Sequence, residues 1–198
     1  MGKGLGSLAA FVISFALLFN RLPQSYERII GWLAPVFGKI LRVTFTSLYL
    51  LMGDPLTDYY LLGAWAAAAF IGGFLAKKIG SGILAALSAY LYNFPVLGYC
   101  VFKLFESFGS LGGFGGFEGG LGGLPPLPPD TSFADLLGAP IISDIVGAFI
   151  SSMALGGTPD LNALISLAAS IILPKILKNV VLIAVCGALG GYVRSKLG

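Results

Sequence analysis

The sequence predicts an all-α, multi-pass membrane protein, on the evidence of its composition, its long apolar runs and the turn residues between them. Of its 198 residues, 57% are hydrophobic and 11% are charged, whereas average soluble chains are about 45–50% apolar and about 25% charged. So little charge leaves too few polar side chains to cover a soluble domain of this size. Because a membrane helix needs about 20 apolar residues, we expect about five or six membrane segments.

The first apolar run covers residues 5–19 and follows a lysine, as in a secretory signal. Asn20, Arg21 and Pro23 follow this run instead of a cleavage site between small residues. We therefore expect a first helix that is retained in the mature protein.

The second run, residues 29–52, is long enough to cross a bilayer and contains Pro35, which predicts a kink. Lys39 and Arg42 lie three positions apart on one face of this helix. Either both side chains reach towards one membrane surface, or the segment begins as an interfacial helix.

Residues 59–76 form the clearest crossing, since tyrosines begin the run and two lysines follow it. Residues 79–105 are apolar again but are interrupted at Asn93 and Pro95. Such an interruption indicates either one kinked crossing helix or two half-helices of a re-entrant segment.

Residues 107–131 break the composition of the chain, because glycine and paired prolines at this density disfavour a helix. We predict N-terminal transmembrane helices over 1–106, a Gly/Pro-rich loop over 107–131, and transmembrane or re-entrant helices over 132–198. In the last part, we expect a helix over 132–155 and another over 161–193 that is broken at its proline.

Two parts of the chain, residues 45–80 and 149–198, resemble each other in order and spacing. The similarity predicts a helix–turn–helix hairpin that is used twice, with an inserted stretch in the second copy. The alternative is a chance match between Gly-rich apolar segments. A pair of glycines recurs near the end of each copy and predicts close helix packing, at Gly72, Gly73, Gly190 and Gly191.

The charged residues predict a topology, since lysine and arginine collect at cytoplasmic helix ends. If residues 79–105 cross, the Gly/Pro loop is external, and if they re-enter, it is cytoplasmic. We expect the acids Asp54, Asp58 and Asp160 outside, and a cytoplasmic set of Arg21, Arg28, Lys77, Lys78, Arg194 and Lys196.

Motifs for cofactors and catalysis are weak in this sequence. Gly80-Ser81-Gly82 with Ala85 fits a loose dinucleotide-binding pattern, but an alanine-rich run precedes it instead of a strand. The chain has no histidine, and its two cysteines lie in apolar runs too far apart for a metal motif. We expect no cofactor, no metal site and no enzymatic activity.

Asp144 is the main candidate for a polar site, because it lies in an apolar stretch where an ionised carboxylate facing lipid is costly. Lys175 and Lys178, after Pro174, are its expected partners. Asn93 either caps a half-helix or binds an ion through freed carbonyls. These residues indicate a transport path, or else an interfacial or structural use of Asp144.

The functional hypothesis that follows is a channel, transporter or translocation-machinery subunit that moves a solute, ion or polymer across a membrane. The alternative is a non-transporting structural subunit of a larger membrane complex. The expected partners are the lipid bilayer and other membrane-protein subunits or a second copy, with nucleic acid only in a DNA-translocation machine. We expect a prokaryotic cell membrane, and a single glutamine suggests a thermophilic source.

Overall fold

The computed structural model describes residues 2–110, 126–128, 131–144, 147 and 161–197, and these residues form helices without a strand. The helices differ widely in length, from a single long C-terminal helix to a short segment of five residues. In chain order they are α1 (Gly2–Phe19), α2 (Gln24–Phe37), α3 (Ile40–Met52), α4 (Tyr59–Ala76), α5 (Ile79–Leu91), α6 (Asn93–Ser110), α7 (Phe133–Leu137) and α9 (Leu161–Lys196).

Three stretches of the described chain are long and apolar enough to cross a membrane, namely Tyr59–Ala76, Ile79–Ser107 and Ala169–Lys196. A fourth is counted if Lys3–Phe19 and Gln24–Phe37, which are bent by 81°, form one broken span. The helical class is therefore confirmed, and the described helices are compatible with membrane insertion.

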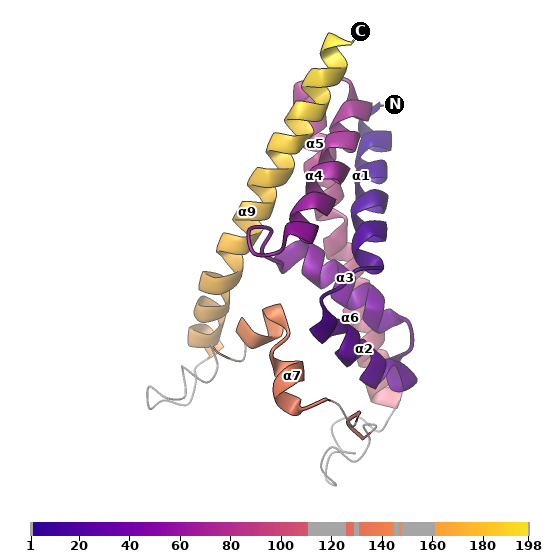
Figure 1. Cartoon of the computed structure of the whole chain (residues 1–198), viewed down its shortest axis with the longest axis vertical. Helices are drawn as coiled ribbons and strands as arrows, with labels where there is room; N and C mark the ends of the chain where they lie inside the picture. Colours follow the sequence, from indigo (N-terminus) through magenta and orange to yellow (C-terminus); the bar gives the residue numbers. More distant parts are fainter. Residues whose placement is uncertain (1, 111–125, 129–130, 145–146, 148–160, 198) are drawn as a thin grey trace.

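Four helices form a bundle in which α4 and α5 are the central pair. Helix α1 packs on one side of this pair and α9 packs on the other (Figure 1). Helices α1 and α5 run in one direction, whereas α4 and α9 run in the other, so that both chain termini lie at the same end (Figure 1). Helices α2, α3, α6 and α7 and the first half of α9 lie beyond the other end of α1 and α4 (Figure 1).

Glycines bring the helix backbones of the bundle into contact. Between α1 and α4, a Cβ at Gly72 would lie 2.8 Å from the Gly6 carbonyl oxygen. Where α4, α5 and α9 meet, a Cβ on either Gly73 or Gly82 would overlap the Gly187 carbonyl oxygen. A Cβ at Gly187 would in turn lie 2.7 Å from the Gly82 carbonyl oxygen. Only glycine permits backbones this close.

The paired glycines of the predicted repeat all lie at such contacts. Gly72 faces α1 and Gly73 faces α9, so adjacent residues of α4 hold helices on opposite sides. Gly190 packs against the backbone of α4 at Phe70, and Gly191 packs against the backbone that begins α5. The described part of the second matching segment therefore packs directly on the first segment, and residues 149–160 lie outside the described part.

The single crossing helix predicted over residues 29–52 is wrong, because the chain forms α2 and α3 instead. Gly38 separates them with φ of 64°, a left-handed conformation that glycine adopts without a steric penalty from Cβ. The C-terminal end of α3 is fixed to the bundle by the Trp65 indole, which donates to the Leu50 carbonyl at 3.1 Å. The Tyr90 hydroxyl donates to the next carbonyl, that of Leu51, at 2.6 Å.

The interruption at Asn93 does not reverse the chain, since α5 and α6 follow one another in the same direction (Figure 1). The buried Asn93 amide donates to the carbonyls of Ala89 and Tyr90, both at 3.3 Å, and so satisfies the end of α5. Pro95 falls in the first turn of α6, where its missing N–H costs no helix bond. Helix α9 likewise continues through Pro174, where a break was predicted.

The prediction that Arg21 and Arg28 lie on the same side as Lys77 is wrong. Helix α1 carries the chain away from that end, so Arg21 lies over the Tyr60 ring at 5.9 Å, next to the start of α4. Arg28 pairs with Asp135 at 3.7 Å. Because Tyr60 lies in the first turn of α4 and Asp135 lies in α7, these arginines share an end of the bundle with the acidic turn before α4.

Adding one methyl group at Gly73 is expected to destabilise the protein, because its Cβ meets backbone rather than a movable side chain. We expect Gly73→Ala to lower the free energy of unfolding by about 1–3 kcal/mol. Gly63→Ala in the same helix is the matched control, since nothing lies within 4 Å of its Cβ position. This control should be neutral or stabilise by up to about 1 kcal/mol. Thermal unfolding in detergent measures both, and equal effects would contradict the backbone contact.

Candidate functional site

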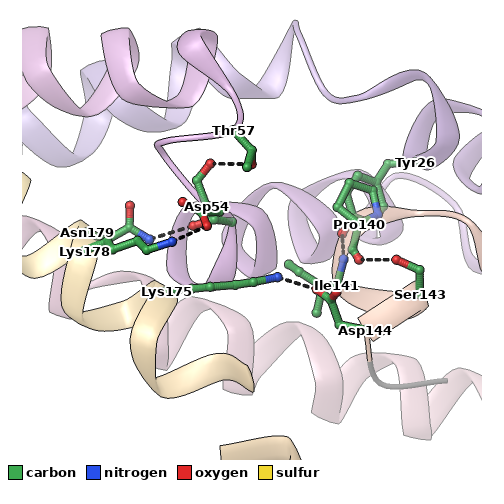
Figure 2. A network of polar contacts seen from close by, with 11 residues as sticks. Tyr26, Asp54, Thr57, Pro140, Ile141, Ser143, Asp144, Lys175, Lys178 and Asn179 are labelled. Carbon is green, nitrogen blue, oxygen red and sulfur yellow. Dashed lines mark hydrogen bonds and ion pairs between the residues drawn. The ribbon is translucent and has the colours of Figure 1, made fainter. Parts of the chain in front are cut away.

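Charged side chains from distant parts of the chain meet where α9 passes the turn between α3 and α4. We call this region the polar junction and define it as Asp54, Asp144, Lys175, Lys178 and Asn179 (Figure 2). The turn supplies the first acid, and the residues after α7 supply the second. Helix α9 supplies the cations and the amide, which share one helix face because Lys178 and Asn179 follow Lys175 by three and four positions.

The turn before α4 is bound to α9 by two contacts. The Lys178 ammonium lies 2.6 Å from a carboxylate oxygen of Asp54, and the Asn179 amide donates to the Gly53 carbonyl at 2.9 Å. The Asp54 side chain is only 15% exposed, and its other oxygen accepts the Leu56 N–H at 3.0 Å. This turn is therefore held by its own local hydrogen bond and by α9 together.

The environment of Asp54 favours its ionised form. Burial alone raises the pKa of a carboxyl, but the hydrogen bonds from Lys178 and from the Leu56 N–H act in the opposite direction. The positive charges of Lys178 and Lys175 add to this effect. The pKa of the Asp54 carboxyl is therefore held below its usual value.

The second ion pair joins Lys175 to Asp144 and fixes the segment of residues 131–144, which contains α7. This segment begins with a capping box at Ser132 and Asp135. The Tyr26 hydroxyl accepts the Ile141 N–H at 3.3 Å and binds the segment to α2. Three of its apolar side chains are buried in the core, those of Leu136, Ala139 and Ile141. The segment is thus anchored by burial as well as by charge.

The structure brings together some of the residues that the sequence predicted and separates others. Asp144 and Lys175 form a pair, whereas Lys178 takes Asp54 as its partner. Asn93 lies in the break between α5 and α6, where its hydrogen bonds are to the end of α5. Asp54 was missed as a site residue, because its Gly-Asp-Pro sequence signals only a turn and nothing local indicates a lysine from α9.

A shallow groove of about 360 Å³ lies on the outer surface beside the junction. Apart from Lys178 its walls are apolar, contributed by Leu56, Leu177, Val181 and Leu182. Each junction cation is paired with a carboxylate. Because the groove beside Lys178 is lined mainly by apolar side chains, it suits an acyl chain better than a hydrated ion.

Two buried amide oxygens close to these elements have no hydrogen-bond partner in the described structure, those of Asn93 and Asn179. The described residues include no group of three or more His, Cys, Asp or Glu side chains arranged to hold a metal ion. As it stands, the junction neutralises its charges in pairs and ties α9 to two other segments, the turn before α4 and the segment that contains α7. Comparison with protein-family models, curated proteins and solved structures found no match.

Removing the Asp54 carboxylate is expected to destabilise the protein in a pH-dependent way. At neutral pH, Asp54→Asn should lower the free energy of unfolding by about 1–2 kcal/mol, since Lys178 is partly exposed and partly screened. Because the pKa of Asp54 is lower in the folded state, its contribution is complete above about pH 4 and is lost as the pH falls through the folded-state pKa.

The gap in stability between wild type and Asp54→Asn should therefore be constant near neutral pH and shrink in acid. Chemical unfolding in detergent at a series of pH values measures this gap. Lys178→Met supplies the control. In this background, Asp54→Asn should lower the free energy of unfolding by less than it does in the wild type. A gap that grows in acid, or strictly additive losses, would show that this pair does not act as described.

Proposed function

We propose that the protein is an integral membrane protein whose bundle serves as a structural subunit of a larger membrane assembly. The observation that carries this proposal is the contact of helix backbones at Gly73, Gly82 and Gly187. At the level of these glycines, the backbones leave no space for water or a solute between α4, α5 and α9. The same contact gives a rigid support with outward-facing apolar surfaces, which is what a scaffold requires.

The lengths of the helices support a specific position in the bilayer. Helices α1 and α4 have 18 residues each, and this length spans about 27 Å at about 1.5 Å per residue. About 24 Å of helix separates Lys178 from Arg194 in α9. These values fit a hydrocarbon core of about 30 Å. We therefore place the hydrocarbon between the polar junction on one side and the lysine-rich end of α4 on the other.

This position assigns an interfacial role to α2, which is bent by 81° from α1 and would lie in the membrane plane. The count of five or six membrane segments stays a prediction, as does the internal repeat. The parallel course of α4 and α9, each with paired glycines before a basic end, supports the repeat. By the distribution of lysine and arginine, that basic end faces the cytoplasm of a prokaryotic cell.

The outer face of α9 supports contact with lipid or another subunit. Apolar side chains that are at least half exposed recur at every fourth residue of this face, at Leu173, Leu177, Val181, Val185 and Leu189. Side chains at this spacing form one ridge along a helix, of the kind that fits the grooves of a neighbouring helix. Partner subunits or a second copy are the proposed occupants within the bilayer.

A second candidate function, translocation of an ion or solute, is favoured by the polar junction. Ionisable residues within membrane segments often mark transport paths, and this junction adjoins the proposed hydrocarbon. Asn179 adds a buried amide oxygen without a partner among the described residues. In this alternative the path runs along the outside of the bundle at α9, next to another subunit, because the bundle interior is filled.

The structural proposal predicts a stable complex in the native membrane. Chemical crosslinking of whole cells, followed by purification of the tagged protein and mass spectrometry, should recover membrane proteins in a fixed ratio or a discrete oligomer. A variant with Val181→Asn and Val185→Asn should lose these partners, and Leu5→Asn with Leu8→Asn on the exposed face of α1 is the matched control.

Recovery of only the monomer with lipid, from wild type and variants alike, would contradict the structural proposal. Ion flux from liposomes that contain the purified protein separates the two candidates. The structural proposal predicts flux at the level of empty liposomes. A proton or sodium flux that disappears in Lys175→Met, while Lys39→Met retains it, would favour translocation instead.

A further inference from the structure

Lysines and arginines from three helices meet at the end of the bundle opposite the polar junction. We call this surface the basic end, and it comprises Lys3, Lys77, Lys78, Arg194 and Lys196. Helices α1 and α4 are antiparallel and touch at Gly6 and Gly72, so Lys3, one turn before Gly6, lies level with the end of α4.

Helix α9 contributes its cations to the same surface. A Cβ at Gly191 would lie 2.6 Å from the Lys78 carbonyl oxygen, which places the last turn of α9 directly against the lysine pair. One turn later, the Arg194 guanidinium lies 5.4 Å from the centre of the Phe74 ring. The Lys196 ammonium lies 5.9 Å from the Tyr192 ring. The aromatic rings hold these two cations near the membrane boundary.

The cations of the basic end have no acidic partners among the described residues. The ion pairs of the described chain all lie towards the other end, and they join Arg28 to Asp135, Arg42 to Glu27, Lys103 to Glu106, Lys175 to Asp144 and Lys178 to Asp54. At the basic end, Lys3, Lys77, Lys78 and Lys196 are exposed. Four exposed, unpaired cations and a fifth beside them produce a positive field that attracts anions.

The backbone between the lysines adds donors to this field. Helix α5 begins immediately after Lys78, and no side chain caps its first N–H groups. Gly80, in that first turn, is exposed and has open space around its Cβ position. An anion held by the lysines therefore has access to uncapped amides as well, which carry partial positive charge.

Apolar side chains beside the cations indicate what kind of anion fits. Ile79 is 45% exposed and Leu197 is 68% exposed, so both project next to the lysines and the arginine. A nucleic acid or an acidic protein surface would leave these side chains in water. A phospholipid would cover them with acyl chain while its phosphate meets the cations.

We propose that the basic end binds the phosphate headgroups of anionic phospholipids in the adjoining leaflet. The lysines of the α4–α5 turn and the cations of α9 contact one headgroup from two sides, and the neighbouring apolar side chains contact its acyl chains. The proposal rests on the bilayer position given above, and it is independent of whether the protein has partner subunits.

Titration of the detergent-purified full-length protein with short-chain lipids tests this site. We expect dioctanoyl-phosphatidylglycerol to raise Tm in a saturable way, and dioctanoyl-phosphatidylcholine or inorganic phosphate to raise it far less. In Lys77→Asn/Lys78→Gln, the apparent Kd for phosphatidylglycerol should rise by about tenfold or more. Asparagine is chosen at position 77 because it tolerates the left-handed φ of 69° found there.

Arg21→Gln/Lys39→Gln is the matched control, since it removes two exposed cations without acidic partners from the other end. It should retain the wild-type Kd. If the lysine variant does not fold, Arg194→Gln/Lys196→Gln carries the same test from α9. Equal binding of phosphatidylcholine, an equal response to inorganic phosphate, or equal loss in the control variant would overturn the proposal. Crosslinked partners recovered from native membranes bear on the structural proposal alone, so the two can fail separately.

Discussion

The structure depends on the contact of three helix backbones at Gly73, Gly82 and Gly187. Within a bilayer, lipid tails are as apolar as leucine, so helices associate through close packing rather than through exclusion of water. Dispersion between backbone atoms, and weak bonds from Cα–H groups to carbonyls, require the close approach that only small residues permit. This contact fixes α9 parallel to α4, and it fills the space between α4, α5 and α9 at the level of these glycines.

The two ends of the bundle follow from the same contact. The C-terminal half of α9 is fixed against α4. The earlier residues of α9 therefore pass the turn before α4, where Lys178 reaches Asp54. The other end gathers cations that form no ion pair with an acid of the described chain. One chain thus presents a neutralised junction at one end of the bundle and a positive surface at the other. In the bilayer position that we propose, this distribution of charge favours one orientation.

The sequence predicted those features that local signals determine. Long apolar runs with few charges specify membrane helices, and the glycines at 72, 73, 190 and 191 indicated surfaces of close packing, where the structure places them. Asp144 with Lys175 could be proposed because few acids and cations lie in apolar stretches. The helix and glycine predictions need only the chemistry of a residue and its immediate neighbours, and the pairing of Asp144 was found because few partners of opposite charge exist.

Tertiary features could not be obtained in this way. The bend at Gly38 depends on a glycine φ that composition does not reveal, and the pairing of Asp54 with Lys178 joins positions that are distant in sequence. Arg21 was placed at the wrong end because the charge rule does not specify how many times the chain crosses before it. Asn93 beside Pro95 looked like a break, but its amide completes the end of α5.

The parallel contact of α4 and α9 is tested most directly by crosslinking. In a variant without Cys100 and Cys186, cysteines replace Phe74 and Arg194, whose side chains lie 5.4 Å apart between ring centre and guanidinium carbon. A short bismaleimide in native membranes should join this pair efficiently. Cysteines at Phe74 and Lys175, about 28 Å further along α9, should remain unjoined. Efficient joining of the second pair, or of neither, would contradict the account.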